Sequence, residues 1–190
     1  FNYNRGDYNF DQLSLTAKYE SKDQYINISG FKRSDAGNTG HYFDPNGIKT
    51  PIHHSYRIDY GVKQGDRQVE TSIGRYITSS GLPDSTQNGL ENGNIISAGL
   101  KVSQSVGSWK INSHFANFMQ HRLIQHSSII DSNYRDINRT LMNIQLETKS
   151  GKIFGIQNQS QNVSSNIHNR SLQWTKIYGQ QIFKNFSILA

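Results

Sequence analysis

The sequence predicts an all-β protein of antiparallel, up-and-down strands, and three observations support that prediction. Apolar and polar residues alternate along much of the chain, short polar turns join pairs of alternating segments, and long polar connections separate one pair from the next. A two-residue period places successive side chains on opposite faces of a strand. Each pair is therefore expected to form a hairpin with one apolar and one polar face.

The clearest hairpin covers residues 55–77. Its two strands alternate apolar with polar side chains, and the polar turn Gln64-Gly65-Asp66 joins them. Opposite residues of an antiparallel pair lie on the same face, so the apolar positions of both strands should form one surface. Those positions are Tyr56, Ile58, Tyr60, Val62, Val69, Thr71 and Ile73.

Three further hairpins and one incomplete pair repeat the pattern, which brings the prediction to about ten strands. In the strand that follows residue 152, either Ile153 or Phe154 and Ile156 could share the apolar face, and a β-bulge would reconcile the two. The other hairpins cover residues 13–31, 95–119 and 142–157, with turns at 21–23, 107–108 and 150–152, and the last pair covers 171–179 and 182–189.

Polar connections with Gly and Pro breakers separate these hairpins, and we predict loops at residues 34–54, 78–94, 120–136 and 158–170. The short turns recur at intervals of roughly 43 residues without a repeated motif. A compact soluble domain rarely contains so many long loops. Short periplasmic turns and long extracellular loops are typical of transmembrane barrels, so we predict an antiparallel up-and-down transmembrane β-barrel.

The composition agrees with this fold class. Hydrophobic residues make up 34% of the 190 residues and the mean hydropathy is −0.70, which excludes a bundle of membrane helices of ~20 apolar residues each. A barrel needs apolar residues only at alternate positions of each strand. Aromatic residues at 11% argue against disorder, and the lack of cysteine excludes a disulfide scaffold and a thiolate metal site.

The few polar residues on the predicted apolar face lie where a bilayer would tolerate them. Lys32, Arg75 and Asn117 occupy the same alternate positions as the apolar residues of their strands and should share their face. All three lie near the long-loop ends of the strands. A lipid-facing cation costs ~2–4 kcal/mol at the bilayer midplane and ~0–1 kcal/mol near the interface. Near the short turns we expect an aromatic girdle of Tyr19, Tyr25, Trp109 and Phe154.

Residues 13–34, LSLTAKYESKDQYINISGFKRS, resemble a strand-turn-strand unit of bacterial outer-membrane barrels of the TonB-dependent receptor or porin-like kind. The resemblance implies a bacterial outer-membrane location and a single domain over residues 1–190 that is a segment of a larger barrel; a complete ten-strand barrel is the alternative. It is a resemblance of pattern. A TonB box and plug motif are not seen, and the chain ends Ile188-Leu189-Ala190 instead of on the family's C-terminal aromatic residue.

The sequence predicts neither an enzyme nor a cofactor or metal site. Ser113-His114 and His53-His54 are adjacent pairs, so the members of each pair should point to opposite faces, and a GxSxG nucleophile motif is absent. His121 and His126 lie near Asp131 and Asp136, but a zinc site needs three or four convergent ligands. Residues 44–47, DPNG, are expected to form a turn rather than a calcium loop.

The polar face supplies the candidate functional residues, because charged side chains on it would line a water-filled lumen and tune its selectivity. They carry both signs with a positive excess, as does the whole chain at +6. Scattered basic residues argue against nucleic acid. The lumen-facing candidates are Lys18, Arg57, Asp59, Lys63, Glu70, Lys101, Lys110, His114, Glu147 and Lys149.

The predicted function is passage or receptor-mediated uptake of a solute through an outer-membrane barrel. The expected partners are outer-membrane lipid, a small solute, and further subunits or a plug domain. One alternative is a soluble, lectin-like β-sandwich whose apolar faces pack against each other. Another is a structural role as a barrel subunit in a membrane assembly.

Overall fold

The computed structural model describes residues 1–6, 11–34, 42–44, 47–49, 51–81, 89–126, 132–182 and 187–189. Asp131 and residues 45–46 of the predicted turn lie outside these ranges. The strands are β1 (Asn2–Arg5), β2 (Asp11–Glu20), β3 (Gln24–Ser34), β4 (Tyr42–Asp44), β5 (Gly47–Lys49), β6 (Ile52–Gln64), β7 (Arg67–Gly81), β8 (Gly89–Val106), β9 (Trp109–His126), β10 (Ser132–Thr148), β11 (Lys152–Ser165), β12 (Asn169–Ile182) and β13 (Ser187–Leu189).

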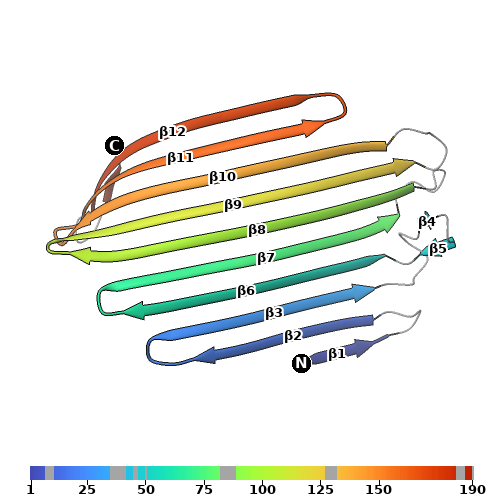
Figure 1. Cartoon of the computed structure of the whole chain (residues 1–190), viewed down its shortest axis with the longest axis horizontal. Helices are drawn as coiled ribbons and strands as arrows, with labels where there is room; N and C mark the ends of the chain where they lie inside the picture. Colours follow the sequence, from blue (N-terminus) through green and yellow to red (C-terminus); the bar gives the residue numbers. More distant parts are fainter. Residues whose placement is uncertain are drawn as a thin grey trace.

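Eleven of these strands form one antiparallel sheet in which spatial order follows chain order, and β4 pairs with β5 in a separate hairpin. Figure 1 shows a curved sheet with the N-terminal strands at one side and β12 at the other. β1 and β13 are its two edges, so the described sheet is open. The predicted all-β, antiparallel, up-and-down arrangement is confirmed, with β1 added to the predicted strands.

The short turns fall where the sequence predicts them, at one end of the sheet (Figure 1). Gly65 and Gly107 are the first residues of two-residue turns and have φ angles of 57° and 62°. Two-residue hairpin turns favour a positive φ at their first residue, because turns of this type have a backbone twist that matches the twist of the two strands. Glycine adopts such a φ without a steric penalty.

The strands are longer than predicted at the opposite end. β8 begins at Gly89 and β9 ends at His126, so part of each predicted loop is strand. The predicted loop 158–170 is wrong, because β11 and β12 occupy most of it and only residues 166–168 form a turn. Both faces of the sheet are polar there, so the alternation that identifies a strand is missing.

Phe154 and Ile156 are the residues of β11 that lie on the apolar face, where they pair with Leu146 and Ile144 of β10. Ile153 lies on the polar face and is 7% exposed. The register of β11 with β10 and β12 runs without interruption, so the expected bulge does not occur.

The apolar face is uncovered in the described part of the chain. Leu15, Ile58 and Leu100 are 45%, 49% and 42% exposed, and Ile153 is the one buried hydrophobic core residue among those described. The other described sheet is the two-stranded β4–β5 hairpin, which lies at the end of the large sheet near the long connections (Figure 1). The described residues also include no helix with the length and apolarity needed to cross a membrane.

The apolar side chains form a band that crosses the strands obliquely. On β2 the band extends from Leu13 to Tyr19, whereas on β10 it extends from Met142 to Leu146. The row of register-paired residues that begins at Leu13 on β2 contains the polar residues His121 on β9 and Asp136 on β10. The band therefore shifts towards the short turns as the sheet is followed from β2 to β11.

Gly107→Ala should lower the free energy of unfolding by about 1 kcal/mol, because an L-residue is strained at positive φ. Gly99→Ala is the control: Gly99 lies in β8, and the nearest atom to an added Cβ is 3.9 Å away. Reversible urea titration measures both. An equal loss in the two variants would contradict this account of the turn.

Candidate functional site on the polar face

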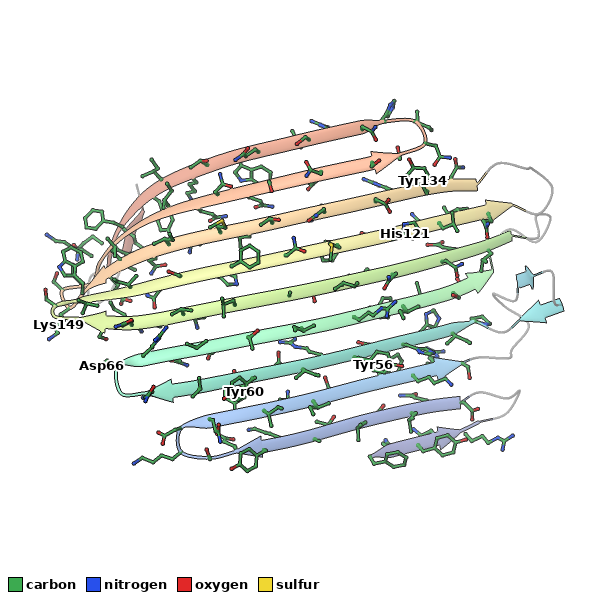
Figure 2. The ribbon with its side chains drawn as sticks, in the orientation of Figure 1. Tyr56, Tyr60, Asp66, His121, Tyr134 and Lys149 are labelled. Atoms are coloured by element: carbon green, nitrogen blue, oxygen red, sulfur yellow. The ribbon has the colours of Figure 1, made fainter. Side chains whose placement is uncertain are left out.

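The register tests where the ten predicted lumen-facing residues lie. Nine of them lie on one face of the sheet, opposite the apolar band, and they come from strands β2, β6, β7, β8, β9 and β10. Lys149 instead lies in the turn between β10 and β11 (Figure 2).

Glu70 is the centre of one polar cluster. Its Oε1 accepts a hydrogen bond from Gln68 Nε2 at 2.9 Å, and its Oε2 lies 3.3 Å from Lys101 Nζ. Lys101 is followed in register by His114 on β9 and Asn143 on β10. A continuous rung of polar side chains therefore crosses β7 to β10.

A second cluster joins neighbouring strand positions of opposite charge. Arg57 Nε donates to Asp59 Oδ1 at 2.8 Å, and Lys18 Nζ lies 2.7 Å from Glu20 Oε2. Positions two apart on a strand share a face, which allows these pairs. Local pairing reduces the charge available to a solute, so no single residue here constitutes a binding site.

Two tyrosines on this face were not recognised from the sequence. The Tyr25 ring lies over Gly61, where an added Cβ would meet ring carbons at 2.2–2.9 Å, and the Tyr178 ring lies in the same way over Gly155. Tyr25 is therefore not on the apolar face, and its predicted place in the aromatic girdle is wrong. The available signal for Tyr25 was its parity, which is opposite to that of the apolar residues Ile26 and Ile28 in the same strand.

Tyr178 also orders the polar face near β10. Its hydroxyl donates to Asn143 Oδ1 at 3.1 Å and lies 3.4 Å from Gln145 Oε1. The Lys176 ammonium lies 5.6 Å from the centroid of the Tyr178 ring, within cation–π range. Tyr178 thus connects β12 with β10 across β11.

Between these clusters the polar face is hollowed by a depression of about 420 Å³. Arg57 and Arg139 border it from opposite sides. Small residues form part of its floor, and Phe118, Leu141 and Gln159 also line it. Short side chains leave room above the sheet. Arg139 supplies positive charge, whereas Asp59 offsets part of the charge of Arg57. The floor residues are Ser72, Ser97, Gly99 and Ala116.

The histidines are distributed as the strand period predicts. His53 and His54 lie on opposite faces: His53 Nδ1 lies 2.7 Å from Thr78 Oγ1, and His54 Nδ1 lies 3.0 Å from Tyr56 Oη. His121 pairs with Asp136 at the end near the long connections (Figure 2). Within the described ranges, no three His, Asp or Glu side chains converge as a metal site would require.

An ion pair lies on the polar face at the end of the sheet near the long connections. Arg122 Nε donates to Glu91 Oε1 at 2.8 Å. This hydrogen bond raises the pKa of Arg122 above its ordinary value. Both residues lie beyond the apolar band, so the pair belongs to the strand extensions that the sequence did not predict.

No family model and no curated protein matches the chain. A solved structure, the ferric citrate transporter FecA in its unliganded form, is similar at 11% sequence identity with a TM-score of 0.47. The similarity covers 90% of this chain and 32% of that one, so the chain spans about a third of the transporter's length. A likeness this weak assigns neither a fold nor a function to the chain.

Gly61→Ala should destabilise the protein by about 1–3 kcal/mol, because the added methyl group displaces the Tyr25 ring. In a Tyr25→Ala background the same substitution should cost little, since the obstructing ring is gone. A double-mutant cycle by urea unfolding measures the coupling. Equal costs in both backgrounds would show that the ring does not lie over Gly61.

Proposed function

We propose that the chain forms part of the wall of a bacterial outer-membrane β-barrel, with its apolar face towards lipid and its polar face towards an aqueous lumen. The barrel would allow passage or receptor-mediated uptake of a solute. We propose no covalent chemistry for it. Its partners would be outer-membrane lipid, a small solute, and further strands, subunits or a plug that complete the lumen.

The exposed apolar face is the observation that carries this proposal. Ile73 is 60% exposed and Ile58 is 49% exposed in the middle of a sheet, with apolar neighbours in register on both sides. Soluble monomers rarely expose contiguous apolar patches of this extent. Lipid chains would cover the band. In the soluble sandwich alternative, a second large sheet would cover it, whereas the other described sheet is the two-stranded β4–β5 hairpin.

The oblique course of the band supports the same proposal. Barrel strands tilt by ~35–45° from the membrane normal, so a flat hydrocarbon layer must cut them at an angle. Each strand then contributes its apolar residues at a different register. In a sandwich, by contrast, the apolar residues of neighbouring strands need no such shift.

Strand length provides a further argument. β8 and β9 have 18 residues each and β10 has 17, whereas ~9–11 residues suffice to cross the hydrocarbon core. The excess lies at the end with long connections, where polar residues outnumber apolar ones. These extensions would project above the membrane surface and carry the loops.

Solute selectivity would depend on the depression between Arg57 and Arg139. It lies on the proposed lumen face, and its floor residues leave space above the sheet. Arg139 favours solutes that carry a carboxylate or phosphate, and Arg57 contributes less because Asp59 offsets part of its charge. The charge excess of the predicted lumen residues is of the same sign.

The two tryptophans provide a direct test of sidedness, because Trp109 lies on the apolar face and Trp174 on the polar face. In bilayers with brominated acyl chains, a Trp174→Phe variant that retains Trp109 should be strongly quenched. A Trp109→Phe variant that retains Trp174 should be quenched little and should respond instead to aqueous acrylamide. Equal lipid quenching of both tryptophans would rule out the proposed orientation.

A pair of adjacent substitutions tests the same point energetically. Ala17→Arg places a cation on the apolar face of β2 and should destabilise the protein by about 2–4 kcal/mol in bilayers. Thr16→Arg, one residue away on the polar face, should change stability by no more than about 0.5 kcal/mol. Urea unfolding from lipid vesicles measures both, and a similar cost for the two would exclude a lipid-facing apolar side.

A further inference from the structure

The apolar band becomes shorter on β11 and β12, which lie together at one side of the sheet (Figure 1). On β8 the band extends from Ile96 to Val102, whereas its side chains on β11 are Phe154 and Ile156 and its side chain on β12 is Ile177. The border nearer the long connections moves towards the short turns. The opposite border cannot follow on β11, because residues 149–151 separate this strand from β10.

The shortened band is too low to cross a bilayer. The apolar zone of a transmembrane barrel is ~25 Å tall, and its strands tilt by ~35–45°. At ~3.3 Å per residue, a strand needs about ten residues, and hence about five positions on one face, to cross that zone. Phe154 and Ile156 supply less than half of these positions. Lipid chains would therefore also meet the residues of β11 and β12 that follow the band towards the long connections.

Uncharged polar groups occupy those positions. On the side of the sheet that carries the band, every residue from Asn158 to Ser164 on β11 and from Asn169 to Thr175 on β12 is Asn, Gln, Ser or Thr. We call these residues the amide face. In contact with hydrocarbon, such groups lose the hydrogen bonds that water provides, which is costly. A polar partner against the amide face would remove this cost.

The amide face retains hydrogen-bonding groups after its internal pairs are formed. Asn158 Nδ2 donates to Thr175 Oγ1 at 2.9 Å, and Ser171 Oγ donates to Asn162 Oδ1 at 2.7 Å. A carboxamide accepts and donates at separate atoms. These two pairs therefore leave Asn158 Oδ1 and Asn162 Nδ2 for contacts with a partner.

The amide face is compatible with a second copy of itself. In a twofold pair the same surface patch of each copy meets the other, so a charge on the patch would meet a like charge. Amides and hydroxyls both donate and accept, so they can pair with their own kind. The other half of this side of the sheet is different, because Lys32 and Arg75 would repel their counterparts.

The shape of the surface also suits a second copy. A groove of about 790 Å³ runs over the part of the amide face nearer the long connections and extends to Ile96 and Met119. Gln173 and Thr175 are exposed and follow directly on the same side of β12. A groove beside projecting side chains is an arrangement in which each copy can insert its side chains into the other.

We propose that two copies of the barrel associate in the membrane through the amide faces of β11 and β12, about a twofold axis along the membrane normal. Each copy would cover the polar surface that the other would otherwise expose to lipid. This inference rests on the proposed lipid-facing orientation and names the partner for the part of that side where the apolar band is too short.

Single-molecule photobleaching of labelled protein, diluted in lipid vesicles, measures the dissociation constant of the pair. Gln173→Lys places like charges face to face and should raise this constant by about a hundredfold. The matched control Gln161→Lys makes the same change on the polar face of β11 and should leave it unchanged. An equal effect of the two substitutions would overturn the proposal.

Bilayer thickness separates this proposal from local thinning of the membrane, which is the other way to accommodate a low apolar band. The parent protein should pair more weakly in dilauroyl than in dioleoyl phosphatidylcholine, because a thinner bilayer places less hydrocarbon against the amide face. A parent protein that is monomeric in both lipids would show that the membrane thins around β11 and β12 and that no second copy covers them.

Lipid quenching of Trp109 distinguishes failure of this proposal from failure of the proposed function. If Trp109 is quenched in Gln173→Lys as in the parent, the variant is inserted and its dissociation constant reports on the amide face alone. If Trp109 is not quenched in the parent, the lipid-facing orientation is wrong and pairing within the membrane is excluded with it.

Discussion

The unbroken backbone ladder from β2 to β12 is the constraint on which the rest of this structure depends. Because side chains alternate with a period of two, a slip of one residue would move every side chain of a strand to the other face. The ladder keeps Ile28, Ile58, Ile73 and Ala98 in one row across four strands. One continuous ladder therefore produces one apolar and one polar surface.

The two surfaces place opposite demands on their surroundings. The polar face satisfies many of its own groups, as the contacts of Glu70 with Gln68 and Lys101 show. The apolar side chains cannot be removed from water by contacts within the same face, because a single sheet cannot bury both of its sides. Something apolar must cover it, and the slanted band is the shape that a flat hydrocarbon layer would impose on tilted strands.

The hollows of the sheet lie where the alternating pattern is interrupted. On the polar face, Gly99 and Ala116 leave space between Arg57 and Arg139. On the other face, amides and hydroxyls replace apolar residues above the band and line the groove beside Arg75. The two hollows therefore lie on opposite sides of the same strands.

The sequence alone determined the strand type, the positions of the short turns and the face of nearly every charged candidate. These properties are local: alternation over a few residues and a glycine at a tight turn suffice to predict them, as at Gly65 and Gly107. The predictions failed where the local pattern was ambiguous. Where both faces of a strand are polar, as between residues 158 and 170, alternation is missing and the sequence predicts a loop in place of a strand.

Only the tertiary structure decided which residues of different strands share a row. The Tyr25 ring over Gly61 and the depression between Arg57 and Arg139 both depend on register. Register is a relation between segments distant in sequence, and hydrogen bonds between their backbones set it. Alternation within one strand carries no information about which residue of the next strand lies opposite.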